Sequence, residues 1–91
     1  MIETIHGRKN GKTVNIGSEN RVISNRVVAI VNPNSAPVKR LINEAKEDHL
    51  LIDATGGKPK RSVIITDSGH IVLSSVSPRN LSARFEKNIL D

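Results

Sequence analysis

The residues of this sequence that are best suited to chemistry lie far apart or in one short turn. Asp67, Ser68 and His70 could suggest acid–base or nucleophilic chemistry. A catalytic triad needs partners that converge from separate elements in a pocket, whereas these three lie together at the tip of a predicted hairpin. A turn that favours Asp, Ser and Gly explains them better. His6 and His49 lie far from His70 with no i, i+4 pair, so a zinc site has little support.

A second segment, Gly56-Gly57-Lys58-Pro59, has part of the pattern of a phosphate-binding loop. It lacks the first glycine of GxxxxGK[ST], and Pro59 stands where that motif needs a hydroxyl, so a nucleotide site of that kind is not expected. Lys60 and Arg61 follow directly. Two interpretations are open for this segment, a solvated turn and a basic loop that contacts phosphates.

Arg26 is the most informative single residue. It lies inside the β-branched stretch Arg21–Val31, where a charge is costly unless it faces outward or is paired. Both a structural salt bridge, with Glu19 or Asp53, and a contact with a ligand fit this position. Asp53 could be a catalytic carboxylate, but it follows an apolar strand, and a hydrogen-bonded residue at the strand end is the better interpretation.

The composition narrows the kinds of partner. The 91 residues predict a single domain, residues 1–91, with a thin core, and they include no Cys, no Tyr, no Trp and one Phe. Single-strand platforms that stack bases on aromatic rings are therefore excluded, while duplex backbone binding through Arg and Lys is not. No apolar stretch approaches the ~20 residues that span a bilayer, and the polar N-terminus has no signal-peptide pattern, so we expect a cytoplasmic protein.

The net charge of +5 is concentrated in two segments. Residues 1–13 carry three cations against one anion, a net of +2, and residues 51–61 likewise carry three against one. Both segments contain glycine, and loops of this kind can reach a ligand without disturbing a core. The charge placement suits a polyanionic partner.

The element pattern predicts an α+β domain of order ββ-α-βββ-α with a mostly antiparallel sheet. Ser35 is the expected N-cap of a helix that ends near Asp48, and Ser77 is the expected N-cap of a final helix. Strands are expected at the following ranges: Ile2–Arg8 and Lys12–Ile16 around an Asn10-Gly11 hairpin turn, Arg21–Val31 with a bend at Ser24-Asn25, a short buried strand at Leu50–Ala54, and Ser62–Ile65 and Ile71–Val76 around a second hairpin turn.

Several strings of the sequence carry a family resemblance over roughly residues 14–85. They are Val14–Gly17, Asn25-Arg26, Ile30–Ile42, Leu51–Thr55, Val63–His70 and Ile71–Val76. In these strings the sequence resembles the RemA family, the extracellular matrix regulatory protein A group. The resemblance implies a bacterial, nucleoid-associated DNA-binding transcriptional regulator of biofilm matrix genes, with a compact α+β fold and ring-shaped homo-oligomers.

The resemblance also indicates which residues contact double-stranded DNA. The family's arginine after Asn corresponds to Arg26, and its basic loop corresponds to Gly56–Arg61. The implied DNA-binding residues are Arg26, Lys58, Lys60 and Arg61, which we expect to form one surface. No cofactor and no metal are expected.

The sequence departs from the family pattern at the loop and at a turn before it. Pro59 replaces a loop arginine and Lys60 replaces a threonine, and a lysine at position 58 cannot copy the bidentate fork of arginine. Ser18-Glu19 stands where the family has an aromatic residue and then Gly, and Glu19 adds a charge that DNA repels. Residues 1–13 are interpreted as an N-terminal extension, predicted as a hairpin, to which the resemblance does not extend.

Three classes of function follow. The first is a homo-oligomeric DNA-binding regulator, favoured by the charge placement, by the thin core and strand edges, and by the resemblance. The second, alternative class is an oligomeric scaffold or interaction protein without specific DNA binding. The third is a small enzyme, which needs a pocket with perturbed titrating groups; no spacing here predicts one, so we expect no enzyme.

Overall fold

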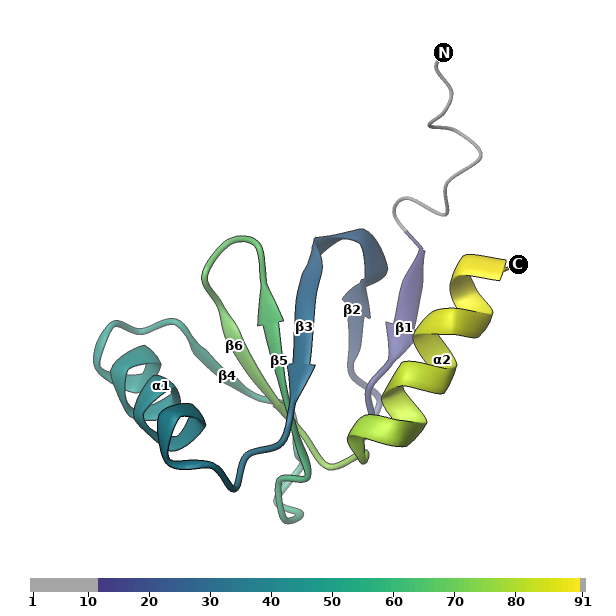
Figure 1. The fold of residues 1–91 in the computed structure, drawn as a ribbon. Helices are drawn as coiled ribbons and strands as arrows, with labels where there is room; N and C mark the ends of the chain where they lie inside the picture. Colours follow the sequence, from purple (N-terminus) through teal and green to yellow (C-terminus); the bar gives the residue numbers. More distant parts are fainter. Residues whose placement is uncertain (1–11, 91) are drawn as a thin grey trace.

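The computed structural model describes residues 12–90, which form two sheets and two helices (Figure 1). The elements, in chain order, are β1 (Thr13–Asn15), β2 (Arg21–Ile23), β3 (Val27–Val31), α1 (Ala36–Glu47), β4 (Leu51–Asp53), β5 (Ser62–Thr66), β6 (Ile71–Ser74) and α2 (Pro78–Leu90). The predicted α+β class with a mostly antiparallel sheet is confirmed, and so is the predicted order of the elements when β2 and β3 are counted as the one strand predicted at Arg21–Val31.

The larger sheet has the strand order β3-β5-β6-β4 and forms the middle layer. Its β3–β5 and β5–β6 pairs are antiparallel, and its β6–β4 pair is parallel. Helix α1 lies on one side, while α2 and the β1–β2 hairpin lie on the other (Figure 1). The four strands therefore carry apolar residues on both faces.

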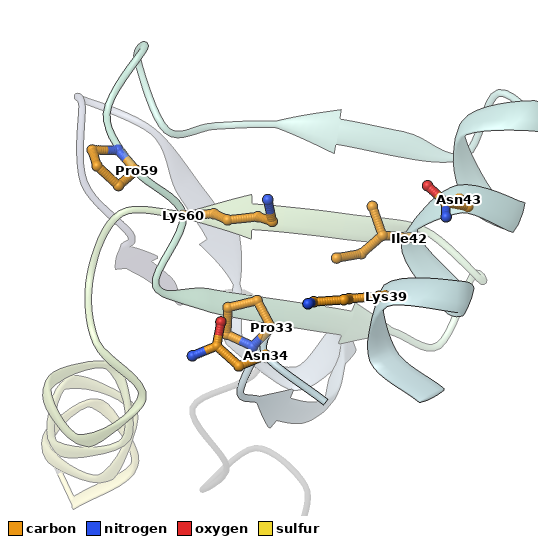
Figure 2. A pocket seen from close by; sticks show the side chains of 7 residues that line it. All are labelled: Pro33, Asn34, Lys39, Ile42, Asn43, Pro59 and Lys60. Atoms are coloured by element: carbon orange, nitrogen blue, oxygen red, sulfur yellow. The ribbon is translucent and has the colours of Figure 1, made fainter. Parts of the chain in front are cut away.

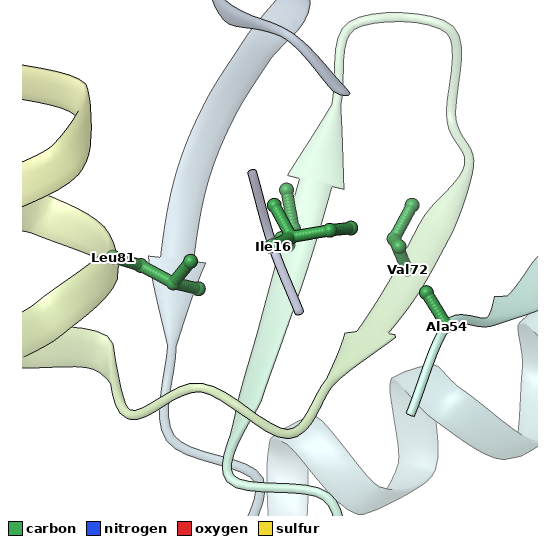
Figure 3. Packing of buried hydrophobic residues seen from close by; sticks show 5 residues of the cluster. Ile16, Ala54, Val72 and Leu81 are labelled. Atoms are coloured by element: carbon green, nitrogen blue, oxygen red, sulfur yellow. The ribbon is translucent and has the colours of Figure 1, made fainter. Parts of the chain in front are cut away.

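Two cores follow from this arrangement, because neighbouring residues of a strand point to opposite faces. Val63 packs with Ala45 of α1 and with the apolar stripe of that helix, while Ile64 packs with the opposite cluster. The opposite cluster joins the elements that cover the other face, and its members include Ile16, Ala54, Val72 and Leu81 (Figure 3). The buried Ser74 hydroxyl donates to the Ile16 carbonyl oxygen at 2.7 Å and ties the first hairpin to the sheet.

Local sequence signals explain both helix starts. The Ser35 hydroxyl accepts from the Val38 backbone N–H at 3.3 Å, and the Ser77 hydroxyl accepts from the Asn80 N–H at 3.3 Å. Each bond satisfies a donor that the first helical turn leaves without a partner, as predicted. Helix α1 ends at Glu47, with Asp48 as its C-cap.

Two sequence predictions need correction. The bend predicted at Ser24-Asn25 is present as a 3₁₀ turn, but this turn covers Ser24–Arg26, so Arg26 lies in a turn between two strands rather than inside one. The strand predicted as buried at Leu50–Ala54 is present as β4, but Ile52 is 48% exposed. Because β4 ends the strand order, it is covered on fewer sides than a central strand.

The N-terminal part of the prediction lies outside the described residues. This applies to the strand expected at Ile2–Arg8 and to its turn at Asn10-Gly11. Between residues 12 and 90, neither helix is long and apolar enough to cross a membrane.

Candidate nucleic-acid interface

Arg26 links two turns at one end of the larger sheet. Its Nε donates to Asp67 Oδ1 at 2.7 Å, and its backbone carbonyl accepts from the Asp67 N–H at 2.9 Å. The ion-pair partner within the chain is thus Asp67, not Glu19 or Asp53 as weighed from the sequence. The two side chains are 55% and 48% exposed, so the ion pair is open to solvent and to a ligand.

The hairpin tip beside Arg26 is held by short-range hydrogen bonds. Ser68 Oγ lies 2.7 Å from His70 Nδ1 and 2.9 Å from Thr66 Oγ1, and the Thr66 hydroxyl also accepts from the His70 N–H at 3.1 Å. All these groups belong to residues 66–70, and Gly69 adopts a positive φ of 87°. The network closes a turn, as the sequence indicated, and does not assemble groups from separate elements.

The basic loop lies at the opposite end of β5. Gly56 and Gly57 both adopt positive φ, at 65° and 85°, and reverse the chain after β4. The cationic residues that follow are all exposed: Lys58, Lys60 and Arg61. The Arg61 N–H donates to the Ser74 carbonyl at 2.8 Å, which fixes the end of the loop to the sheet and leaves the side chains outside.

Within one chain, the structure does not bring Arg26 and the loop together. Asp67, the partner of Arg26, directly follows β5, and Arg61 directly precedes it. The five residues of β5, at about 3.3 Å each, separate the two ends by roughly 17 Å. Arg26 and the basic loop therefore lie at opposite ends of the sheet (Figure 1).

A turn with an acidic residue packs against the start of the basic loop. The Asn20 N–H donates to the Gly17 carbonyl at 2.9 Å, and the two central residues, Ser18 and Glu19, take φ of 53° and 64°. Positive φ at both central positions defines a type I′ turn, which glycine and asparagine fit best. The Ser18 hydroxyl donates to the Thr55 carbonyl at 3.1 Å, so the turn carrying Glu19 is fixed beside the loop.

Asp53 is a hydrogen-bonded residue at a strand end, as predicted. Its Oδ1 accepts from the Thr55 hydroxyl at 2.6 Å and from the Thr55 N–H at 3.0 Å. These two bonds, together with the charge of Lys60, lower the pKa of Asp53 below its ordinary value. Asp53 thus stays ionised and offsets part of the positive charge of the loop.

Two hollows on the surface, both relevant to binding, were not predicted from the sequence. Ile23 and Ile52, 45% and 48% exposed, line an apolar hollow of about 250 Å³ that Arg26 and His70 also border. On the other face of the sheet, Lys60 shares a hollow with Lys39 of α1 (Figure 2). Lys39 is exposed on α1, and the periodicity of a helix cannot show which residues of other elements lie opposite such a side chain.

Comparison with known proteins gives consistent matches. Residues 13–85 match the family described as RemA-like, extracellular matrix regulatory protein A-like. A regulatory protein of Acaryochloris marina is 53% identical over 85% of this chain and 88% of its own length. One of Dictyoglomus thermophilum is also 53% identical, over 82% and 88%, and one of a Thermoanaerobacter species is 54% identical, over 85% and 80%. All three carry names that denote regulatory proteins.

Proposed function

Because this chain belongs to the RemA-like family of regulatory proteins, we propose that it regulates transcription by binding duplex DNA as a homo-oligomer. The observation that carries the proposal is the exposed basic loop. Lys58, Lys60 and Arg61 stand on a glycine turn whose backbone is fixed to the sheet. Cations held in this way attract the phosphate backbone without reading its sequence.

Arg26 is the second proposed contact. A guanidinium has five N–H donors, and the ion pair with Asp67 uses the one on Nε. Between residues 12 and 90, the terminal nitrogens have no hydrogen bond within the chain, so they can serve a phosphate while Asp67 fixes the orientation of the side chain. In this arrangement Arg26 stabilises the fold weakly through Asp67 and also contacts DNA.

Apolar surface at both edges of the larger sheet supports an oligomer. Ile23 and Ile52 border the hollow beside β4. At the other edge, Val28 is 68% exposed and borders a hollow of about 310 Å³ between β3 and Phe85 of α2. Two different apolar surfaces on opposite edges suit a head-to-tail contact, which closes into a ring when the rotation allows it.

This contact explains how separated basic groups could act together. If copies join edge to edge, the strands run roughly perpendicular to the direction in which the copies repeat around the ring. Arg26 is then repeated along one rim and the basic loop along the other. The single surface expected from the sequence becomes two tracks of positive charge. We infer that such a nucleoid-associated ring acts on extracellular matrix genes in the bacterial cytoplasm.

The test is a titration of fluorescently labelled duplex DNA over a series of salt concentrations, with light scattering on the same sample. We expect a particle several times the 9.9 kDa chain mass, and an affinity whose log–log salt slope is about −0.9 per neutralised phosphate. Substitution of glutamine at Lys58, Lys60 and Arg61 should flatten this slope. A monomer, or a salt-independent affinity, would refute the proposal, and an oligomer that does not bind DNA would favour a scaffold instead.

A further inference from the structure

The hollow shared by Lys39 and Lys60 has the properties of a binding site of its own. It has a volume of about 530 Å³ and lies between α1, the connection before α1, and the end of the basic loop. Its volume falls in the range of roughly 300–1,000 Å³ that small-molecule sites occupy. Figure 2 shows the two lysine side chains extending into this space from opposite sides, Lys39 from the helix and Lys60 from the loop.

The side chains that line the hollow carry positive charge and no negative charge. No carboxylate of the described residues lines it, and neither lysine forms an ion pair in this part of the chain. Asp53 lies outside the hollow and interacts electrostatically with Lys60, so it offsets part of the charge of that lysine. Two ammonium groups directed into one space repel each other. An anion bound between them is attracted by both, and this attraction outweighs the repulsion.

The position of Lys39 strengthens the same field. It lies in the first turns of α1, which has no acidic residue in its first turn. A cation there meets the positive end of the helix dipole, an arrangement that costs the helix stability and raises the local positive potential. The placement is therefore unfavourable for the folded chain alone and favourable once an anion is bound.

The remaining walls suit an organic group attached to that anion. Pro33, Pro59 and Ile42 provide apolar surface, and the side-chain amides of Asn34 and Asn43 stand beside it. Among the described residues, these two amides have no hydrogen bond. Amides can both donate and accept, as the polar edges of a sugar or a base require.

We propose that this hollow binds a nucleotide, with its phosphate between Lys39 and Lys60 and its nucleoside against the proline walls. The nucleotide can be free in solution or be part of a DNA strand, since both offer the same phosphate ester. The site does not depend on Arg26, and it extends the cationic surface from the loop to α1.

The test uses ADP as the probe, with adenosine as the control that lacks phosphate. By isothermal titration calorimetry, the parent protein should bind ADP saturably and adenosine at least tenfold more weakly. Lys39→Gln and Lys60→Gln should each weaken ADP binding by about tenfold, as expected for the loss of one charge-assisted hydrogen bond. Lys46→Gln, which removes the same charge from the same helix outside the hollow, should change it less than about twofold.

Addition of duplex DNA distinguishes the two sources. If DNA displaces ADP and Lys39→Gln weakens DNA binding more than Lys46→Gln does, the hollow binds a nucleotide of DNA. If DNA binds without displacing ADP, the hollow binds a free nucleotide. ADP binding by a protein that does not bind DNA would keep the site and remove the proposed function. Three outcomes would overturn the site. Lys39→Gln, Lys60→Gln and Lys46→Gln could all change ADP binding equally, or adenosine could bind as tightly as ADP. In the third outcome, the parent protein does not bind ADP saturably, and Lys39→Gln changes its DNA affinity no more than Lys46→Gln does.

Discussion

Replacing Arg26 by alanine separates a DNA contact from a structural ion pair, because the structure limits how much stability the side chain can provide. The Arg26–Asp67 pair is short, at 2.7 Å, but both side chains are about half exposed. Exposed ion pairs stabilise proteins by about 0.2–1 kcal/mol, since water screens them and two side chains must be held in place. In a chain of this size, 1 kcal/mol changes Tm by about 4–8 °C. We therefore expect Arg26→Ala to lower Tm by no more than about 8 °C.

The effect on DNA binding should be larger than the effect on folding. Loss of one phosphate contact lowers the log–log salt slope by about 0.9, and a ring repeats the loss in every copy that contacts DNA. Asp67→Asn is the matched variant: it removes the same ion pair but keeps the arginine and takes away a carboxylate that repels phosphates. Asp67→Asn should thus lower Tm as little as Arg26→Ala does and, because it keeps the cation, should bind DNA more tightly than Arg26→Ala does.

Three measurements on both variants decide the question: the melting temperature by circular dichroism, the particle size by light scattering, and the DNA affinity by fluorescence anisotropy over a salt series. A folded, oligomeric Arg26→Ala protein with the parental salt slope would show that Arg26 does not contact DNA. A loss of the oligomer, or a far larger drop in Tm, would show that the ion pair is structural and that DNA binding is lost as a consequence.

Three further predictions concern the residues around the basic loop. A Cβ on Gly56 would lie 2.9 Å from Ser18 Cβ, whereas a Cβ on Gly57 would meet open space. Gly57→Ala should therefore lower the free energy of unfolding by about 1–2 kcal/mol, for its positive φ alone. Gly56→Ala should lower it by about 1–3 kcal/mol more, and thermal or urea denaturation measures both changes. Glu19→Gly should raise Tm, because it relieves a non-glycine residue at φ 64°, and should tighten DNA binding measured by anisotropy by removing an anion near the loop; a lower Tm would contradict this. Because the folded pKa of Asp53 is depressed, its stabilising contribution is present above about pH 4 and is lost as the pH falls through the folded pKa, and acid melts of Asp53→Asn should lack this part of the pH dependence.

The parts of the fold that depend on local interactions could be predicted from the sequence. Ser35 caps α1 because its hydroxyl reaches an N–H three residues ahead, and this reach is set by covalent geometry. The turn before His70 needs positive φ at Gly69, and glycine supplies it at little cost. In such cases residue type and spacing contain the whole physical cause, so no knowledge of distant contacts is required.

The exposure of β4 depends on the strand order, which the sequence does not state. Ile52 lies in an apolar stretch and fits a buried strand by composition. The strand pairs only with β6 among the described strands, because the chain returns from α1 to the edge of the sheet and runs parallel to its neighbour. An apolar strand at an edge looks like a central strand in sequence, and only the topology, or a second copy that covers it, distinguishes the two.

The separation of Arg26 from the basic loop has the same kind of origin. About 30 residues lie between them in sequence, and a resemblance that assigns both to DNA binding gives no reason to expect them far apart. In the structure, β3 and β5 are antiparallel, so the start of β3 lies beside the end of β5, and Arg26 meets Asp67 while the loop remains at the start of β5. A DNA partner that contacts both groups must therefore reach over the length of a strand or over more than one copy of the chain. Exposed side chains cannot close a gap of roughly 17 Å that is set by five paired strand residues, so Arg26 and the loop contact separate parts of the DNA, and repetition in an oligomer would multiply both contacts.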